Sequence, residues 1–406
     1  MTLRNLPAKY PSITINFDGA KKLDGRITFT RASYTSGGTP VNQPSAGTGT
    51  SGEKLQEFNI NVPRLTDKGL LIEESRTNIF RPSIIPETSS LSWTVDGADL
   101  TANSGLAPDG SNTATLYDHS ASTGNSRFYT FTGGTVQDEA YSFFIKDGGG
   151  AGVFKFQFVS GFGTGGASGV CQFDFSTNTL GGAFPTNNPE KIQASPLANG
   201  WFRITATNNV TVTGVTSGVL QFGSSTSTGK TLVWGFQREE ATKFSTSYIP
   251  TTTATVTRAD DLVEITGTNF SSWYSQSEGS FSFIAPTLKK SFANKRVVST
   301  TSSSPTEGVQ FWNSSGSQAR YRIYKGGSTE VDISAGTYEG AKWGWVYKTN
   351  DAALFKDGAL LKRDTSCAMP TAATSLSIGT DGVKHISSLT YYPTRLSDDA
   401  LRGLTQ

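Results

Sequence analysis

Residues that usually carry catalysis are few in this chain and do not form a familiar pattern. Only two histidines occur, His119 and His385, and neither stands in a motif that supplies the nucleophile and carboxylate of a catalytic triad. The chain contains no Gly-x-Ser-x-Gly elbow, no His-Glu-x-x-His motif and no clustered cysteine and histidine ligands. We therefore interpret both histidines as ordinary surface or packing residues. We expect no catalytic residue, no metal site, no cofactor and no enzymatic activity.

Paired carboxylates are the remaining route to hydrolysis, because glycoside hydrolases use two carboxyl groups about 5–9.5 Å apart. Two adjacent pairs occur, Glu73-Glu74 and Glu239-Glu240. Adjacent residues of a strand point to opposite faces of the sheet, so neither pair makes such a site by itself. Pairing between distant carboxylates stays open, and a polysaccharide depolymerase therefore stays the third option for the function.

Exposed aromatic side chains on β-sandwich faces can stack on sugar rings, and the last third of the chain offers several. The three that we select as candidate glycan-binding residues are Trp312, Tyr321 and Tyr324. Trp312 is followed by Asn-Ser-Ser-Gly-Ser, so it lies near a predicted loop and is the best exposed candidate. Three further aromatic residues alternate with other residue types over 343–347. They share one face of a predicted strand, and we expect that face to be core.

The composition predicts short strands joined by long loops. The chain has 406 residues, of which 44 are glycine, and 11% of its residues are aromatic although only 35% are hydrophobic. Disordered chains are poor in aromatic residues, and a single hydrophobic core usually stops growing at about 250–300 residues. We therefore expect an all-β, antiparallel protein with more than one domain.

Charge, cysteine content and hydropathy exclude several classes of protein. The 35 basic and 33 acidic side chains give a net charge of +2, which makes no electrostatic case for binding nucleic acid. Cys171 and Cys367 stand far apart in the chain, so we expect two buried free thiols and no disulfide framework. The N-terminus lacks the apolar region of a signal peptide, and no run of about 18 apolar residues occurs. We expect a protein that is made in a cytoplasm and inserts into no membrane.

Runs of alternating hydrophobicity predict two β-sandwiches after an N-terminal arm. Residues 1–85 hold few clear strands and a long loop over 34–52 that is rich in Gly, Ser, Thr and Pro, so we predict an extended attachment arm or module there. Residues 86–265 and 266–406 each contain many short apolar runs bounded by turn residues. This spacing is typical of antiparallel sandwiches or jelly rolls.

Three local patterns make sharper predictions. In the run Val-Phe-Lys-Phe-Gln-Phe-Val at 153–159, the three phenylalanines point the same way and should face the core. Asp357 and Gly358 stand between two apolar runs and predict a two-residue hairpin turn. Ser397 is a natural N-cap followed by two aspartates, so the last ten residues form the one convincing helix.

Two N-terminal segments, RITFTRAS at 26–33 and PRLTDKGLLIEESRTNIF at 63–80, form a long and unusual pair of motifs. They resemble a module that recurs near the N-terminus of tailed-bacteriophage structural proteins, ahead of fibre or head-spike domains. The positions that match its core include Arg31, Glu73, Glu74, Arg76 and Asn78. Buried charges persist when they are paired, so Glu73, Glu74 and Arg76 are expected to form a fixed charge network beside a backbone arm.

A second pair of segments, ANGWFRITATNNVTV at 198–212 and VWGFQREEATKFSTSYIPTTTATVTRADD at 233–261, also forms a recognisable pattern. It resembles the end of a carbohydrate-binding-module-like β-sandwich that is common in the same phage proteins. The matching positions include Trp201, Trp234, Tyr248, Pro250 and Arg258. The resemblance implies that these residues lock the last strand and the exit linker, and they are not the sugar contacts of that family.

The final segments ALFKDGALLK, SLSIGT and HISSLTYYPTRLSDDALRGL lie within about 280–406. They resemble the concanavalin A-like, laminin-G-like fold, whose corresponding hairpin matches Asp357 and Gly358. Some members of that fold bind calcium and glycans through loops. The sequence shows no clear acidic cluster, so whether a loop binds calcium stays open.

The order of these resemblances implies a bacteriophage virion surface protein, such as a tail fibre, a spike or a head fibre or decoration protein. Its N-terminus would dock onto other virion proteins of the tail or capsid. Its sandwiches would contact host surface polysaccharide or lipopolysaccharide. Fibres and spikes are usually homotrimers, so a homotrimer located in the virion is expected. The alternative is a purely structural capsid or tail component that cements or connects other proteins and binds no glycan.

Overall fold

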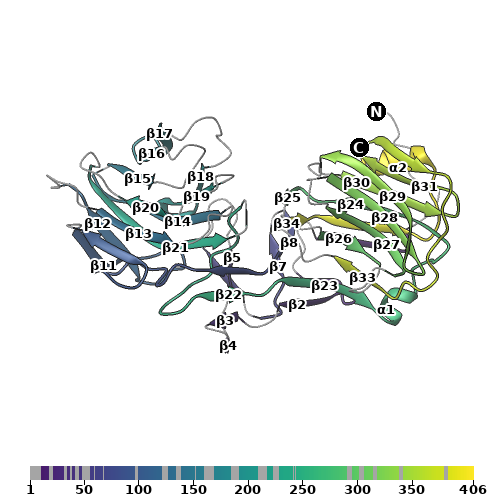
Figure 1. Cartoon of the computed structure of the whole chain (residues 1–406), viewed down its shortest axis with the longest axis horizontal. Helices are drawn as coiled ribbons and strands as arrows, with labels where there is room; N and C mark the ends of the chain where they lie inside the picture. Colours follow the sequence, from purple (N-terminus) through teal and green to yellow (C-terminus); the bar gives the residue numbers. More distant parts are fainter. Residues whose placement is uncertain are drawn as a thin grey trace. The chain divides into compact units, whose positions relative to one another are not determined.

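The protein is nearly all β, and its sheets are built from antiparallel strand pairs (Figure 1). Two short helices are present among the described residues. No helix in the described ranges is long and apolar enough to cross a membrane. The structure, a computed structural model, describes residues 11–17, 22–31, 34–36, 39–41, 45–47, 55–58, 60–66, 68–96, 99–120, 127–133, 139–150, 152–159, 169–183, 192–208, 217–222, 228–240, 242, 244–289, 295–300, 306–313, 318–337, 342–378 and 383–406.

The chain forms two compact units, and both are assembled from separate stretches of sequence. Unit 1 comprises Met1–Ala32, Ile60–Ser75 and Ala259–Gln406, and unit 2 comprises Ser33–Asn59 and Arg76–Arg258. The prediction of a separate N-terminal arm over residues 1–85 is therefore wrong. Three of its strands, Ile13–Asn16, Thr28–Arg31 and Gly69–Glu73, pair with strands that lie hundreds of residues later, and these pairs supply hydrogen-bond partners for their backbone groups.

Unit 1 is a sandwich of two large sheets with a smaller third sheet. The six-stranded sheet has the order β1 (Ile13–Asn16), β35 (Ser388–Tyr392), β24 (Glu278–Ile284), β30 (Lys342–Lys348), β31 (Ala352–Lys356) and β32 (Ala359–Asp364). The seven-stranded sheet has the order β2 (Thr28–Arg31), β23 (Asp261–Thr266), β33 (Ser375–Ile378), β26 (Lys295–Ser299), β27 (Gly308–Asn313), β28 (Gln318–Lys325) and β29 (Ser328–Thr337). The small sheet has the order β25 (Thr287–Lys289), β34 (Val383–Ile386), β8 (Gly69–Glu73) and β7 (Arg64–Thr66).

The aromatic face predicted over 343–347 is core, which confirms that prediction. Trp343, Trp345 and Tyr347 are at most 1% exposed and belong to the main hydrophobic cluster of unit 1. Phe311 stacks on the Trp345 ring from the seven-stranded sheet, with 5.3 Å between ring centroids. Inward-facing residues of both sheets therefore meet in one layer, as sandwich packing requires.

The hairpin and the C-terminal helix are also confirmed. Asp357 and Gly358 link β31 to β32 with φ values of 47° and 78°, and positive φ at both central residues is the mark of a type I′ turn. Helix α2 (Asp398–Leu404) begins after Ser397, whose hydroxyl accepts a hydrogen bond from the Ala400 N–H at 3.2 Å. No sequence pattern predicted α1 (Thr268–Ser271), a single turn that buries Phe270.

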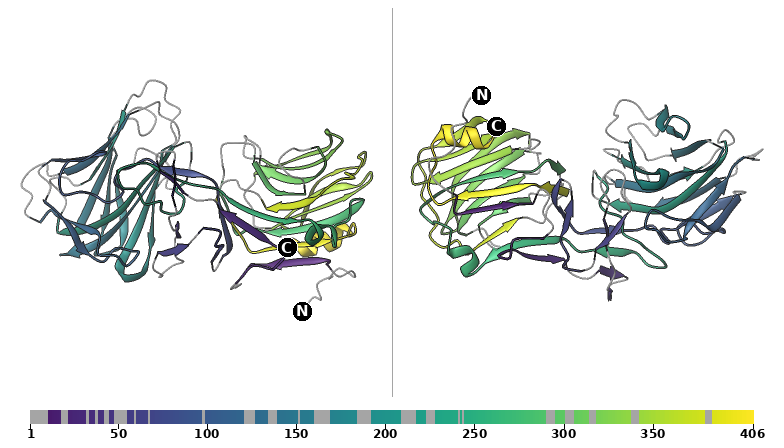
Figure 2. Two further views of the ribbon diagram at one scale, coloured as in Figure 1. Left: turned by 90° about the horizontal axis from the view of Figure 1, so that it is seen from below. Right: turned by 180° about the vertical axis from the view of Figure 1, so that it is seen from behind.

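Unit 2 is a second sandwich, whose sheets can be followed from two further directions in Figure 2. One sheet has the order β10 (Trp93–Asp96), β13 (Arg127–Gly133), β20 (Ser217–Phe222), β15 (Val153–Val159), β16 (Gly169–Asp174) and β17 (Thr179–Ala183). The other has the order β11 (Asp99–Gly105), β12 (Ala114–Asp118), β21 (Lys230–Glu240), β14 (Glu139–Gly149), β19 (Trp201–Asn208) and β18 (Ile192–Pro196). Two small sheets add β4 (Thr39–Val41), β3 (Tyr34–Ser36), β22 (Val256–Arg258), β9 (Arg76–Asn78), β5 (Ser45–Gly47) and β6 (Gln56–Phe58).

A cluster of phenylalanines fills the core of unit 2. Phe154 and Phe156 are buried there, as predicted, and the side chain of Phe158 lies outside the described part of the chain. Phe143 and Phe236 stack with their ring centroids 5.2 Å apart. Cys171 belongs to this cluster, and Cys367 belongs to the core of unit 1, so both thiols are free and buried as expected.

Candidate functional site

The outer face of the seven-stranded sheet in unit 1 gathers polar and aromatic side chains around Trp312. Successive side chains of a strand point to opposite faces, and directly paired residues share a face. Val309 and Phe311 of β27 belong to the core, so Gln310 and Trp312 point outward. The residues paired with these two on β28 are Arg322 and Arg320. We call this surface the Trp312 face, and its central members are Arg296, Gln310, Trp312, Arg320, Arg322, Tyr324 and Asp332.

Arg322 is the best-anchored side chain of the Trp312 face. Its guanidinium carbon lies 4.1 Å from the centroid of the Trp312 ring, a cation–π distance. It donates hydrogen bonds to Asp332 Oδ2 at 2.8 Å and to the Tyr324 hydroxyl at 3.0 Å. Burial lowers the pKa of Arg322, but its hydrogen bonds and charge interactions with Asp332 and Tyr324 together outweigh this and leave the pKa above its usual value. Arg322 therefore stays a fixed cation.

Arg320 is held more loosely. Its guanidinium carbon lies 6.0 Å from the Trp312 centroid, and its Nε approaches Asp332 Oδ1 at 3.5 Å. The side chain is 30% exposed, against 17% for Arg322. Because Asp332 is shared by two arginines, it cannot neutralise both of them.

Two donors of the Trp312 face have no hydrogen-bond acceptor among the described residues. Gln310 is only 3% exposed, yet its amide Nε2 is unpaired, and so is the indole Nε1 of Trp312. An unsatisfied buried polar group costs about 1–3 kcal/mol, and both atoms are themselves buried, so a buried water is their natural partner. The face is thus rich in donors and offers no nucleophile with a base beside it among its described members.

The three predicted glycan-binding residues divide between the two faces of the sheet. Trp312 and Tyr324 are half-buried on the outer face. The prediction for Tyr321 is wrong: it is fully buried in the core, and its hydroxyl donates to the Val346 carbonyl at 2.9 Å. Burial raises the pKa of Tyr321 well above its usual value. Positions 321 and 324 differ by an odd number, so one strand cannot present both on the same face.

Sequence reasoning missed the polar members of the Trp312 face. The run Gln-Ala-Arg-Tyr-Arg-Ile-Tyr-Lys at 318–325 alternates between polar and apolar residues. This alternation places Arg320 and Arg322 beside Tyr324 and could have identified them. No local signal pairs them with Asp332, because that pairing depends on the register between β28 and β29.

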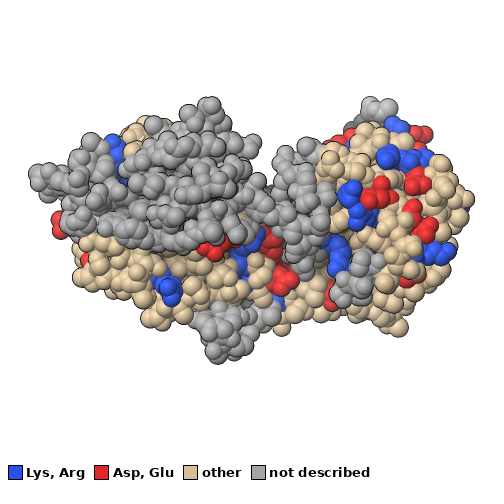
Figure 3. All heavy atoms as spheres, viewed as in Figure 1, with Lys and Arg blue, Asp and Glu red and all other residues tan. Residues whose placement is uncertain are grey.

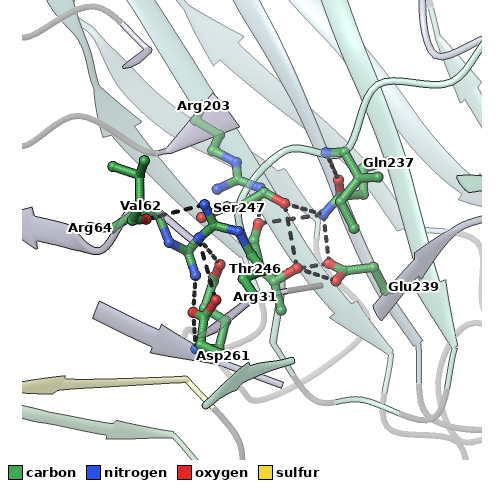
Figure 4. Close-up of polar contacts among 11 residues, drawn as sticks. Arg31, Val62, Arg64, Arg203, Gln237, Glu239, Thr246, Ser247 and Asp261 are labelled. Atoms are coloured by element: carbon green, nitrogen blue, oxygen red, sulfur yellow. Dashed lines mark hydrogen bonds and ion pairs between the residues drawn. The ribbon is translucent and has the colours of Figure 1, made fainter. Parts of the chain in front are cut away.

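The N-terminal motif residues build a buried charge cluster inside unit 1. Arg31 Nη1 lies 3.3 Å from Asp261 Oδ1, and Arg64 lies beside them (Figure 4). The Arg64 guanidinium bridges Asp261 and Glu73. The Glu73 N–H also donates to Asp261 Oδ2 at 2.9 Å. Burial lowers the pKa of Arg64, but the charges of Asp261 and Glu73 outweigh it and raise that pKa. We call these four residues the buried charge cluster.

The prediction of a charge network around Glu73, Glu74 and Arg76 identified one member of this cluster. Glu73 is a buried structural residue, but the structure joins it to Arg64 and Asp261, which the sequence did not single out. Glu74 is buried at 6% exposure, and the Arg76 guanidinium lies 5.8 Å from the Phe244 ring centroid in unit 2. The missing partner, Asp261, stands nearly two hundred residues later, so no local pattern could have indicated it.

The closing motif of unit 2 is held by buried hydrogen bonds. Glu239 accepts from the Thr246 N–H at 2.9 Å, from the Thr246 hydroxyl at 2.5 Å and from the Gln237 amide at 2.8 Å (Figure 4). Burial raises the pKa of Glu239 despite these bonds. Asn78 donates to the carbonyls of Phe236 and Ile249 at 3.0 and 2.8 Å. These contacts tie the last strands together, in the structural role that the motif implied.

The remaining motif residues of unit 2 also lie in packed surroundings. The indole N–H groups of Trp201 and Trp234 donate to the Leu106 carbonyl at 3.2 Å and to the Thr113 hydroxyl at 2.9 Å. The hydroxyls of Tyr248 and Ser83 are 2.5 Å apart. Pro250 is half-buried and Arg258 is completely buried.

The histidines and adjacent carboxylates do not converge on a reactive group in the described ranges. His119 is buried, with its Nε2 3.1 Å from the Thr231 hydroxyl and its ring 4.8 Å from that of Tyr117. His385 is half-buried in β34. Glu239 is buried whereas the side chain of Glu240 is 56% exposed, as the opposite faces of a strand require. No three potential metal ligands come together among the described residues.

Charged side chains of both signs are mixed on the visible surface. The coloured lysines and arginines of Figure 3 lie next to aspartates and glutamates and do not gather into one large patch of a single sign. The Trp312 face is thus a local concentration of cations on a protein whose net charge is only +2.

Comparison with known proteins gives remote structural likenesses alone. No family model matches the chain, and no curated protein matches it. The CBM40 module of the Ruminococcus gnavus sialidase bound to α2,6-sialyllactose is 14% identical over 34% of this chain and 88% of that chain, with a TM-score of 0.29. A structure of botulinum neurotoxin type C, whose cell entry depends on interaction with two ganglioside molecules, is 9% identical over 36% of this chain and 40% of that chain, with a TM-score of 0.30. The leech intramolecular trans-sialidase is 14% identical over 32% of this chain and 23% of that chain, with a TM-score of 0.26.

Proposed function

We propose that the protein is a bacteriophage virion surface protein that contacts host surface glycans through the Trp312 face. The observation that carries the glycan part is the partly exposed Arg320, which lies beside the Trp312 ring and shares Asp332 with a second arginine. Sugars present many hydroxyl oxygens, and an outward sheet surface with fixed donors and an aromatic ring suits them. Asp332, which is 33% exposed, adds an acceptor for sugar hydroxyl protons.

The virion part of the proposal rests on the resemblance of the segments at 26–33 and 63–80 to phage structural proteins. In this proposal the N-terminal region docks onto tail or capsid proteins, and binding replaces catalysis as the activity. A homotrimer would present three Trp312 faces to one cell surface. Linked sites of this kind raise the overall affinity by about 10²–10⁴-fold without any new contact.

The test is binding of the full-length protein to an array of bacterial surface polysaccharides and oligosaccharides. We expect saturable binding to some members, and Trp312→Ala should weaken it at least about tenfold, because the ring holds Arg322 in place and lies beside Arg320. Leu361→Ala is the matched control, since Leu361 is an exposed apolar residue, 41% accessible, on β32 of the other large sheet. Unchanged thermal melting of both variants shows that they fold.

Each rival function has its own outcome in this test. Equal losses in Trp312→Ala and Leu361→Ala would contradict a site at the Trp312 face. No binding to any member would favour the structural capsid or tail component. Shortening of a bound polysaccharide during incubation, measured as release of reducing ends, would favour the depolymerase.

A further inference from the structure

The aromatic ring of the Trp312 face is not free to act as a simple stacking platform. The Arg322 guanidinium lies 4.1 Å from the ring centroid, and Arg320 lies at 6.0 Å. An aromatic ring attracts cations to its face, so Trp312 serves first to hold these guanidiniums. A sugar that approaches the sheet meets arginine donors before it meets the indole ring.

The charges of the Trp312 face do not balance. Arg296 pairs directly with Trp312 across β26 and β27, so three arginines share the centre of the face: Arg296, Arg320 and Arg322. Its one described carboxylate at that centre is Asp332, which pairs with Arg322 on β28. Glu330, at the bulge of β29, instead accepts a hydrogen bond from the Ala368 N–H at 3.2 Å. On β28 and β29 two of these cations, Arg320 and Arg322, share the single anion Asp332, which leaves an excess of one positive charge there.

Of the arginines on β28, Arg320 makes the weaker polar contacts with the rest of the protein. It donates no hydrogen bond within the described part of the chain, and its approach to Asp332 is 3.5 Å. Its direct partner on β27 is Trp312, whereas the buried Gln310 pairs with Arg322. Arg320 is 30% exposed and shares Asp332 with a second arginine, an arrangement that an anionic group satisfies and a neutral hydroxyl satisfies only in part.

We propose that the Trp312 face selects acidic sugar residues, with Arg320 as the side chain that pairs with the sugar carboxylate. Arg322, which is held by Asp332 and Tyr324, fixes the indole ring beside Arg320. This inference rests on the proposed glycan-binding function and adds the charge of the ligand to it. The planar carboxylate suits the fork of an arginine, whose hydrogen bonds to carboxylates are about twice as strong as neutral ones.

The test compares acidic oligosaccharides with their own neutral forms. Oligosaccharides that contain uronate or sialate residues are each paired with the product of carboxyl reduction, and both are titrated into the full-length protein by calorimetry. We expect the acidic form of a bound pair to bind about tenfold or more tightly than its reduced form. Its affinity should fall as sodium chloride is raised from 50 to 500 mM, because salt screens exposed charges.

Three variants assign the preference to this face. Arg320→Gln should weaken the acidic form about tenfold and leave the reduced form nearly unchanged. Arg402→Gln makes the same change on α2, at an exposed residue away from the seven-stranded sheet, and should change neither. Asp332→Asn should tighten the acidic form several-fold, because it removes the carboxylate that competes for the arginines. A gain in affinity cannot come from misfolding.

The outcomes separate this inference from the proposed function. Equal affinity for acidic and reduced forms would overturn the inference and leave glycan binding intact. An acidic preference that neither Arg320→Gln nor Asp332→Asn alters, or that Arg402→Gln lowers equally, would overturn the assignment to this face. If no sugar of either form binds, the proposed function itself fails.

Discussion

Unit 1 contains two groups of arginines and carboxylates that share their chemistry and differ in their surroundings. In the buried charge cluster, Arg64 is 1% exposed and bridges Asp261 and Glu73. On the Trp312 face, Arg320 is 30% exposed and shares Asp332 with a second arginine. Buried ions must be fully compensated, whereas surface ions can stay partly unpaired because water screens them. The same side chains therefore hold the fold together in one place and remain available to a ligand in the other.

We expect the largest effect on folding for a fragment that lacks all four residues of the buried charge cluster. The fragment 266–406 corresponds to the sandwich that sequence alone delimits, but it lacks β1, β2, β7, β8 and nearly all of β23. Large sheets that lose edge and inner strands expose core residues and unpaired backbone groups. We expect this fragment not to fold, as measured by the absence of dispersed amide signals in its NMR spectrum. A stable, cooperatively melting fragment would contradict the assignment of these strands to unit 1.

Asp261→Asn is the sharpest single test of the buried cluster. It removes the carboxylate that both Arg31 and Arg64 contact in a site without solvent. Breaking a buried ion pair destabilises proteins by about 3–5 kcal/mol. We expect a loss of this size in the free energy of unfolding, measured by urea-dependent hydrogen exchange of the unit 1 strands. A loss below about 1 kcal/mol would show that the cluster contributes little to stability.

A group of charged residues with intermediate burial lies at the start of α2. There Asp398 contacts Arg395 at 2.8 Å and also pairs with Arg363 at 2.5 Å. Burial raises the pKa of Asp398, but the hydrogen bonds from both arginines outweigh it, and the net pKa lies below the usual 3.8. A carboxyl group with a lowered folded pKa stabilises the fold above its unfolded pKa, and this contribution disappears as the pH falls through the folded value.

Asp398→Asn should therefore lower the stability by about 1 kcal/mol at pH 7, through lost ion pairs and a lost charge at the helix N-terminus. The difference between variant and wild type should shrink as the pH is lowered from 4 towards 2. Thermal melting across this range measures it. A difference that stays constant with pH would mean that the carboxylate charge is not what stabilises the helix start.

The smallest expected effect is that of Asp332→Asn on stability. This pair is about one third exposed on its carboxylate side, and exposed ion pairs contribute about 0.2–1 kcal/mol. We expect the melting temperature to change by no more than a few degrees, while the affinity for acidic sugars rises. A large loss of stability would place Asp332 with the buried cluster and weaken the contrast between the two groups.

The predictions that depend only on neighbouring residues were correct. The alternation over 343–347, the Asp357-Gly358 turn and the Ser397 cap depend on neighbouring residues, and the structure confirms all three. The error at Tyr321 was avoidable, since the period of two already separates it from Tyr324.

Features of long range could not be predicted in the same way. The strands of the predicted arm pair with β23, β34 and β35, and the register of these pairs is set by the packed core. The buried charge cluster joins residues from three stretches of chain for the same reason. The Trp312 face could be predicted only in part. Its aromatic members were identified as candidates from the sequence, whereas its arginines resemble ordinary charged surface residues.

The pairing of β1 with β35 has a consequence for synthesis on the ribosome. Ile13 pairs with Tyr391, so 378 residues (391 − 13) must be translated before the first strand meets its partner. At about 5–20 residues per second, this takes roughly 20–75 s. Unit 2 uses residues 33–258 only and can close during that time, whereas β1 waits with apolar side chains and backbone groups exposed. The interval is one in which chaperones protect nascent chains, so the yield of folded protein should depend on them more for unit 1 than for unit 2.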